Sequence, residues 1–179
     1  MFNKKFVYIT LSVLISSLFS ISPAGAQEKG YRYWGYFQSP TGMKPWVSSM
    51  TGPTTNVPDG SVEGWVFTFS SDSIVDAQAP RTLPNFNRLC ASTKAVNNKK
   101  RVGIVIDFGR ASLRPQGETP PANIATCVVV NVNAIGFDIA QAVAKIRASA
   151  SGFVCAFNAY PGKECGAEVP TPSTLIIKK

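Results

Sequence analysis

Runs of β-branched and aromatic residues dominate the chain after residue 30, and they predict most of its structure. Each run is short and bounded by turn-forming residues, which is typical of strands. The five predicted strands are Tyr31–Phe37, Trp65–Ser70, Arg101–Phe108, Cys127–Val132 and Gly152–Phe157. The third of these runs is almost continuously apolar, as expected for a central strand that is buried on both faces.

Helical periodicity is clear in one segment, Phe137–Ala148, where four apolar residues recur at helical spacing and two basic residues lie near the C-terminal end. A shorter helix is expected within Pro80–Ala95, with Thr82 or Asn85 as its cap. The stretches 39–61, 109–123 and 158–179 are rich in turn formers and predict loops, the last a Cys-closed turn with a Pro-rich tail. The sequence therefore predicts a single α+β domain, with a mixed sheet packed on one or two helices.

The first 26 residues have the three parts of a secretory signal peptide. Two lysines precede the 14-residue apolar run Phe6–Phe19, and small residues follow at 24–26. A membrane-spanning helix needs roughly 20 apolar residues, so the run predicts a cleaved signal instead. We expect cleavage between Ala26 and Gln27, a secreted domain over residues 27–170 and a short tail, 171–179, without a transmembrane anchor.

An even number of cysteines in an exported chain indicates disulfides. The four are Cys90, Cys127, Cys155 and Cys165, and they allow three pairings. Cys90–Cys127 and Cys155–Cys165 are favoured because each bridge would close one contiguous supersecondary unit. A zinc site is the alternative, but the chain has no C-x-x-C pair and no histidine, so we expect no metal.

The chain is basic. Of its 18 basic and 10 acidic residues, two lysines lie in the predicted signal, so 16 and 10 remain and the mature net charge is +6. Outside the cytoplasm such a charge favours phospholipid head groups or wall polymers, and nucleic acid is not an expected partner. The cluster Lys99–Arg101 is interpreted as a solvated turn before a strand.

Most catalytic chemistry is excluded by composition. Without histidine, neither a Ser-His-Asp nor a Cys-His arrangement can form. No phosphate-binding loop is present, and no cofactor is expected. Carboxylate pairs remain, and Asp59 with Glu63 would form the acid and base of a wall-directed glycan hydrolase. Because Asp59 lies in an ordinary Pro-Asp-Gly turn, a non-enzymatic protein is the leading interpretation.

The aromatic residues of the N-terminal half suggest a ligand site. Three tryptophans with three nearby charged residues would form an apolar pocket with a few polar groups that orient a ligand. These candidates are Arg32, Trp34, Trp46, Asp59, Glu63 and Trp65. The alternative is that the aromatic rings simply form the core.

Several motifs together resemble a family of small secreted proteins of Gram-positive, actinobacterial-type organisms. They are Tyr31–Trp34, Pro58–Trp65, Ala79–Arg81, Arg101–Gly109, Gly152–Cys155 and Tyr160-Pro161 with Cys165. The resemblance covers nearly all of the predicted mature chain, and Pro58–Trp65 is its most specific part. Family genes often lie near energy-coupling-factor transporters for vitamins or cobalt. Val66 departs from the pattern, because relatives carry arginine there.

These observations lead to one leading hypothesis and two alternatives. The leading one is an exported binding protein for a small ligand or a membrane or wall component, acting as an accessory to vitamin or cobalt uptake with a membrane transporter as partner. The alternatives are the glycan hydrolase described above and a structural or adhesive surface domain.

Overall fold

The computed structural model describes residues 27–176 except residues 44 and 50. The predicted signal peptide, which ends at Ala26, lies outside the described residues. No helix within the described ranges is long and apolar enough to cross a membrane.

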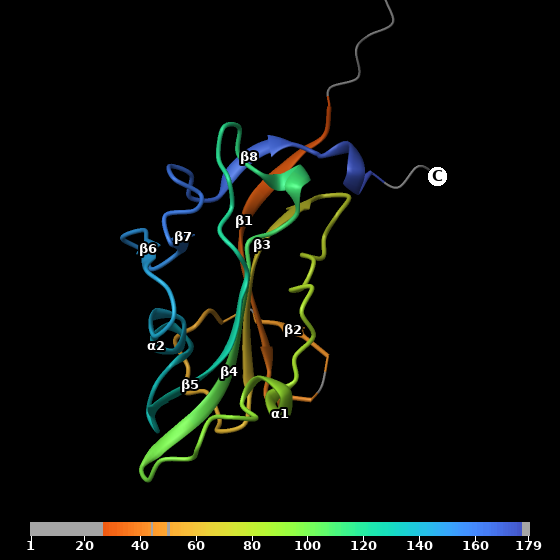
Figure 1. The fold of residues 1–179 in the computed structure, drawn as a ribbon. Coiled ribbons are helices and arrows are strands. Elements are labelled where there is room, and N and C mark those ends of the chain that lie inside the picture. Colours follow the sequence, from red (N-terminus) through yellow and green to blue (C-terminus); the bar gives the residue numbers. More distant parts are fainter. Residues whose placement is uncertain (1–26, 44, 50, 177–179) are drawn as a thin grey trace, which may run out of the picture.

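A six-stranded mixed sheet forms the frame of the domain (Figure 1). Its strands run in the order β2-β1-β3-β4-β5, and β8 pairs with the same edge of β1 as β2 does. β3 and β4 are parallel, whereas the other pairs are antiparallel. The bounds are β1 Lys29–Ser39, β2 Val47–Ser48, β3 Val62–Ser71, β4 Lys99–Asp107, β5 Ile124–Asn131 and β8 Ala167–Pro170.

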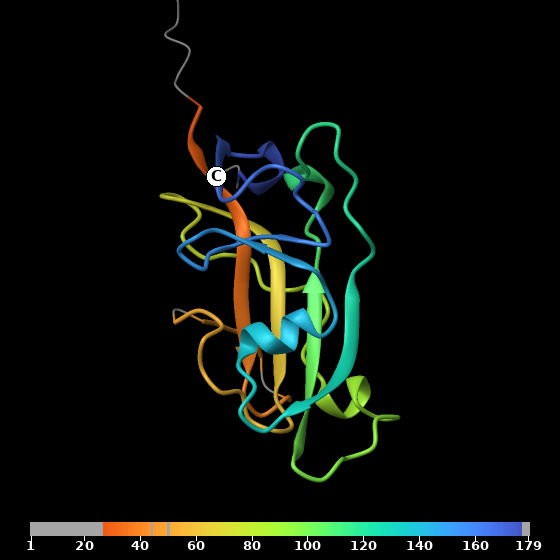
Figure 2. The ribbon, with the colours of Figure 1, turned by 90° about the vertical axis from the view of Figure 1, so that its left-hand side faces the viewer.

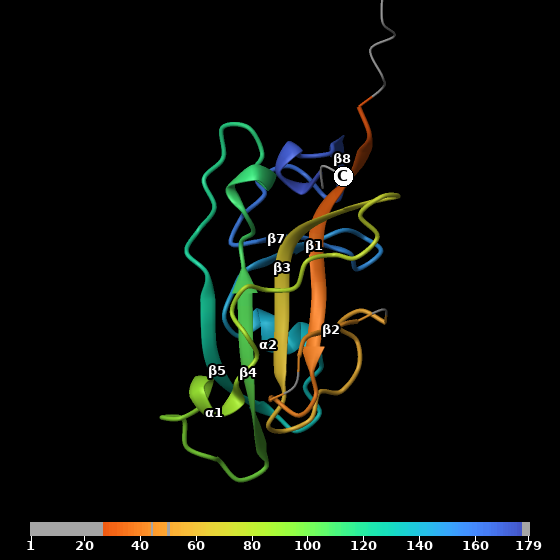
Figure 3. The ribbon, with the colours of Figure 1, turned by 90° about the vertical axis from the view of Figure 1, so that its right-hand side faces the viewer.

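Short elements cover the two faces of this sheet. Figure 2 shows one face crossed by α2 and by the hairpin of β6 and β7. Figure 3 shows the opposite face, where the connection from β3 to β4 passes over the sheet and carries α1. The bounds are α1 Phe86–Leu89, α2 Gly136–Gln141, β6 Ile146–Ala148 and β7 Val154–Phe157, with 3-10 turns at Ala111–Leu113 and Ser173–Leu175.

The hydrophobic core lies between the sheet and the layer of α2, β6 and β7. Strand pairing places Trp34 opposite Phe67 and Tyr36 opposite Trp65, so their side chains share this face. Phe157 of β7 packs edge-on against both indoles, with ring centroids 4.7 Å from Trp34 and 5.2 Å from Trp65. Such aromatic contacts add to the stabilisation that comes from burying the rings.

Two disulfides, one from α1 to β5 and one from β7 to the segment before β8, confirm the favoured pairing. Cys90, at the C-terminal end of α1, is bonded to Cys127 of β5. Cys155 of β7 is bonded to Cys165, just before β8. The first bridge closes a 37-residue separation, for which the chain-entropy model gives about 4 kcal/mol of stabilisation.

The five predicted strands, the short helix with its Asn85 cap and the α+β class are confirmed. The long helix over Phe137–Ala148 is wrong, because α2 ends at Gln141 and Ile146–Ala148 is a strand. The backbone N–H of Lys145 donates to Asn158 Oδ1 at 2.9 Å, and Ile146 pairs with Phe157. Pairing with β7 therefore overrides the helical pattern.

The predicted loops also contain regular structure. β2 lies within the long 39–61 loop, a 3-10 turn lies within 109–123, and the Pro-rich tail contributes β8. These pieces are too short for a sequence pattern, and only their pairing with β1 defines the two strands.

Candidate functional site

One edge of the sheet is left partly open. β3 pairs with Gly30–Ser39 of β1, but on the other edge β8 covers only Lys29–Arg32 and β2 covers only Phe37 and Gln38. Among the described residues, positions 33–36 have no strand partner on this edge, apart from the N–H of Ser49 donating to the carbonyl of Tyr36 at 2.9 Å. β1 therefore presents free backbone groups between two short strands.

A cleft of about 630 Å³ lies beside this open edge, a size that suits a small ligand. It is bounded by residues 33–36 of β1, Trp65, residues of the 48–54 loop, Ala77 and the 151–154 turn that leads into β7. None of its described lining residues carries a formal charge. Hydroxyl groups of five Ser and Thr residues and the exposed ring of Phe153 lie at its walls.

The floor of the cleft is connected to a buried polar cluster through Tyr36. The Tyr36 hydroxyl donates a short hydrogen bond to Glu63 Oε2. Gln38 Nε2 donates to both, at 3.0 Å to the Tyr36 oxygen and 3.3 Å to Glu63 Oε2. Glu63 is only 1% exposed. Desolvation raises the pKa of Glu63 to about 7, against the lowering effect of these hydrogen bonds and of Lys100.

Burial acts in the same direction on Tyr36, whose pKa is raised by desolvation and then by the neighbouring Glu63 carboxylate. Its hydroxyl is tightly enclosed, because a Cβ added at Gly136, the first residue of α2, would lie 2.3 Å from the hydroxyl oxygen. Glycine at this position therefore lets α2 approach the sheet directly over the Tyr36–Glu63 pair.

Lys100 lies on the same face of the sheet and fixes the adjacent loops. Its Nζ donates to Asn56 Oδ1 at 2.8 Å and to the carbonyls of Val57 and Ala134 at 2.5 and 2.7 Å. Desolvation lowers the pKa of Lys100, opposed mainly by the charge of Glu63. These three acceptors explain how an amine can be buried there.

The sequence-predicted candidates divide into two groups. Trp34 and Trp65 belong to both the core and the cleft wall. Glu63 does not line the cleft, but it accepts a hydrogen bond from Tyr36, which does. Arg32 lies on β1 with Trp34, but its side chain pairs with Glu164 and donates to the carbonyl of Leu113.

Trp46 and Asp59 lie apart from the cleft. The Trp46 ring packs against Gly64 on the opposite face of the sheet, and its Nε1 donates to the carbonyl of Thr82 at 3.1 Å. Asp59 is exposed in a turn, where its Oδ1 accepts from the N–H of Arg101 at 2.6 Å. Asp59 therefore holds a turn, whereas Glu63 is enclosed by Tyr36 and Gln38.

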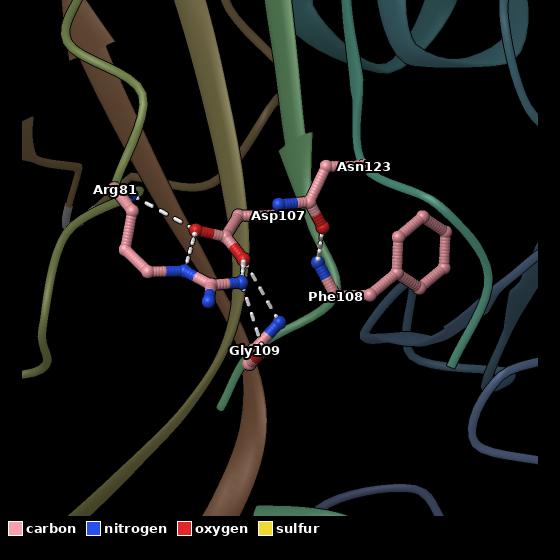
Figure 4. A network of polar contacts seen from close by, with 5 residues as sticks. All are labelled: Arg81, Asp107, Phe108, Gly109 and Asn123. Atoms are coloured by element: carbon pink, nitrogen blue, oxygen red, sulfur yellow. Dashed lines mark hydrogen bonds and ion pairs between the residues drawn. The ribbon is translucent and has the colours of Figure 1, made fainter. Parts of the chain in front are cut away.

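A further buried carboxylate, Asp107 at the end of β4, is held by Arg81 (Figure 4). Arg81 donates to Asp107 Oδ2 from its backbone N and from Nε, each at 2.9 Å, and its Nη2 pairs with Oδ1. The N–H of Gly109 also donates to Oδ1, at 3.0 Å. Burial alone would raise the pKa of Asp107, but these donors outweigh it and lower the pKa below its usual value.

Tyr36, Gln38, Phe153 and the 48–54 loop were not predicted as site residues. The alternation of β1 does place Tyr36 and Gln38 on one face with Trp34, which is a usable signal. Nothing local indicates that this edge is open or that Phe153 lies against it, because both depend on where β2, β7 and β8 end.

The family profile of the SCO2322-like domain matches residues 26–170. This chain belongs to that family. No curated protein and no solved structure matches it. The family name states no activity, so the cleft has to be interpreted from its own chemistry. Within the described residues, no group of three or more His, Cys, Asp or Glu side chains is placed to hold a metal ion.

Proposed function

We propose that this protein is an exported, non-enzymatic binding protein whose ligand occupies the cleft at the open edge of β1. The observation that carries the proposal is the combination of a roomy cleft, an aromatic wall and unpaired strand backbone in one place. Pockets that bind small ligands commonly combine apolar walls with a few fixed polar groups.

Export is supported by two features. Residues 1–26 have the composition of a secretory signal, and both disulfides are of the kind that persists in oxidising compartments. The proposed role as an accessory to vitamin or cobalt uptake, with a membrane transporter as partner, rests on the resemblance to secreted proteins whose genes lie near such transporters.

A binding role is favoured over the two alternatives for specific reasons. A hydrolase based on Asp59 and Glu63 would need both carboxylates in one open cleft, but Asp59 holds an exposed turn and Glu63 is buried. A purely structural domain would explain the buried Trp34 and Trp65, but it gives no reason for a cleft beside them.

The test is a ligand screen with a matched pair of variants. Thermal shift and isothermal titration of the mature chain would be run against cobalamin, other vitamins, cobalt ions and wall-glycan fragments. Ligand at 100 times its Kd adds about 2.7 kcal/mol to stability, which a thermal shift detects. Thr54 lines the cleft and is exposed, and its neighbour Thr55 is exposed but does not line it.

Thr54→Trp should fill the cleft and weaken binding at least about tenfold, a loss of roughly 1.4 kcal/mol, whereas Thr55→Trp should leave affinity unchanged. The proposal is wrong if no compound class produces a shift, or if a bound ligand is equally tight in both variants.

A further inference from the structure

The backbone of Trp34 points into the cleft. In an antiparallel strand, alternate residues direct their N–H and C=O to the same edge. The carbonyl of Glu28 accepts from Thr171 N at 2.7 Å and that of Tyr36 accepts from Ser49 N at 2.9 Å, both on the open edge. Trp34 is an even number of residues away from both Glu28 and Tyr36, so its backbone groups face the same edge. Its N–H and C=O therefore lie side by side at the cleft, in the gap between β8 and β2.

This gap is too short for a long strand. β8 covers the edge of β1 up to Arg32 and β2 covers it from Phe37. The four positions between them extend about 13 Å, at roughly 3.3 Å per residue. A second copy of the chain that paired along β1 would collide with β2 and β8, so the free backbone pair suits a compact ligand.

One more feature of the wall restricts the chemistry of that ligand. The described lining residues carry no charge, so they offer nothing to neutralise an ion that leaves water. An uncharged ligand is therefore favoured.

We infer that the cleft recognises an uncharged amide-type group, whose carbonyl accepts from Trp34 N–H and whose N–H donates to Trp34 C=O. A cyclic amide or ureide meets this requirement, because its ring holds N–H and C=O on one side. A single residue of an extended peptide meets it too. The inference rests on the proposed function and specifies its ligand class, with the ring of Phe153 as the apolar contact.

The test is NMR titration of the ¹⁵N-labelled mature chain with small probes. 2-Piperidone carries both groups, and N-methyl-2-piperidone keeps the ring and the carbonyl but lacks the N–H. The first should move the Trp34 amide and Trp65 indole signals. It should also bind about fivefold to tenfold tighter than the second, as one neutral hydrogen bond predicts. Thr54→Trp should abolish these shifts and Thr55→Trp should not.

Two further probes distinguish the source of the group. Tighter binding of 2-imidazolidinone than of N-acetyl-alanine N-methylamide assigns the site to a cyclic small molecule, and the reverse order assigns it to a peptide segment. Equal affinity of the two piperidones, or an unmoved Trp34 amide, overturns the inference. If amides fail but another screened compound binds in the cleft, only this inference is lost; if nothing binds there, the proposed function fails as well.

Discussion

Glu63 and Asp107 are both almost completely buried, on neighbouring strands, yet their pKa values move in opposite directions. Glu63 faces the core layer and, among the described residues, accepts hydrogen bonds from the neutral groups of Tyr36 and Gln38. Asp107 faces the other side of the sheet and accepts from the Arg81 guanidinium and two backbone N–H groups.

The difference shows that the donors around a carboxylate decide whether burial leaves it charged. Around Asp107, a guanidinium and backbone donors bond directly to the carboxylate, and the charged form wins in spite of desolvation. Around Glu63, the bonded donors are a phenol and an amide, and Lys100 acts through its charge alone, so desolvation wins. Asp107 is therefore a structural anchor for the 80–82 segment. Glu63 is a group that titrates near neutral pH, directly behind the cleft.

The largest effect is expected from breaking the charged pair. Arg81→Ala leaves Asp107 buried without its cation and should cost about 3 kcal/mol, measured by urea unfolding at pH 7. Adding Asp107→Asn should recover part of the loss, because the unpaired charge is then gone. Arg88→Ala, an exposed arginine on α1, is the control and should change stability by less than about 0.5 kcal/mol. Equal losses for the two arginines would show that the ion pair is unimportant.

An effect of similar size is expected from pH. The pKa of Glu63 is raised from 4.5 to about 7 in the folded protein, so its contribution is complete below pH 4.5 and is lost as pH rises through 7. At about 1.4 kcal/mol per unit, this predicts a fall of roughly 3 kcal/mol in unfolding free energy between pH 4.5 and 8.

Glu63→Gln should remove most of this decline in urea titrations at several pH values. Lys100 is present in both proteins, so the difference between them isolates Glu63. Asp107 acts with the opposite sign, since its lowered pKa stabilises the fold above pH 3.8 and that contribution is lost in acid. Parallel pH curves for the two proteins would contradict a neutral Glu63.

The smallest effect sharpens the role of the phenol. Tyr36→Phe removes the short donor to Glu63 and should cost about 1 to 2 kcal/mol, more at pH 8 than at pH 5, because the hydroxyl stabilises the charged carboxylate more than the neutral one. The Tyr33 hydroxyl, which accepts from Ser70 at 3.3 Å, provides the control. Tyr33→Phe should change stability little at pH 5 or at pH 8. A loss for Tyr36→Phe that does not depend on pH would argue against coupling between the phenol and the charge of Glu63.

The sequence predicted the strands well because their runs are long and rich in β-branched and aromatic residues. Arg101–Phe108 is the clearest example, and residues 102–108 are all buried as expected. The helix over Phe137–Ala148 was wrong in its second half, where Ile146 pairs with Phe157. Helical spacing over a few alanine-rich residues cannot anticipate a strand partner that lies 11 residues further along the chain.

The candidate site was predicted in part. Glu63, Trp34 and Trp65 lie at or behind the cleft, whereas Arg32, Trp46 and Asp59 have structural partners elsewhere. Residue chemistry selected aromatic and acidic groups, but it could not assign them to faces and edges before the strand register was known.

By itself, the sequence determined the α+β class, the five predicted strands and the favoured cysteine pairing, because hydrophobic period, turn residues and the contiguous units between cysteines can be recognised along the chain. Only the tertiary structure decided that β1 keeps an open edge, that a cleft lies beside it and that Glu63 and Asp107 have opposite surroundings. These features arise where segments far apart in sequence meet, since pairing and desolvation depend on the partner and not on the residue alone.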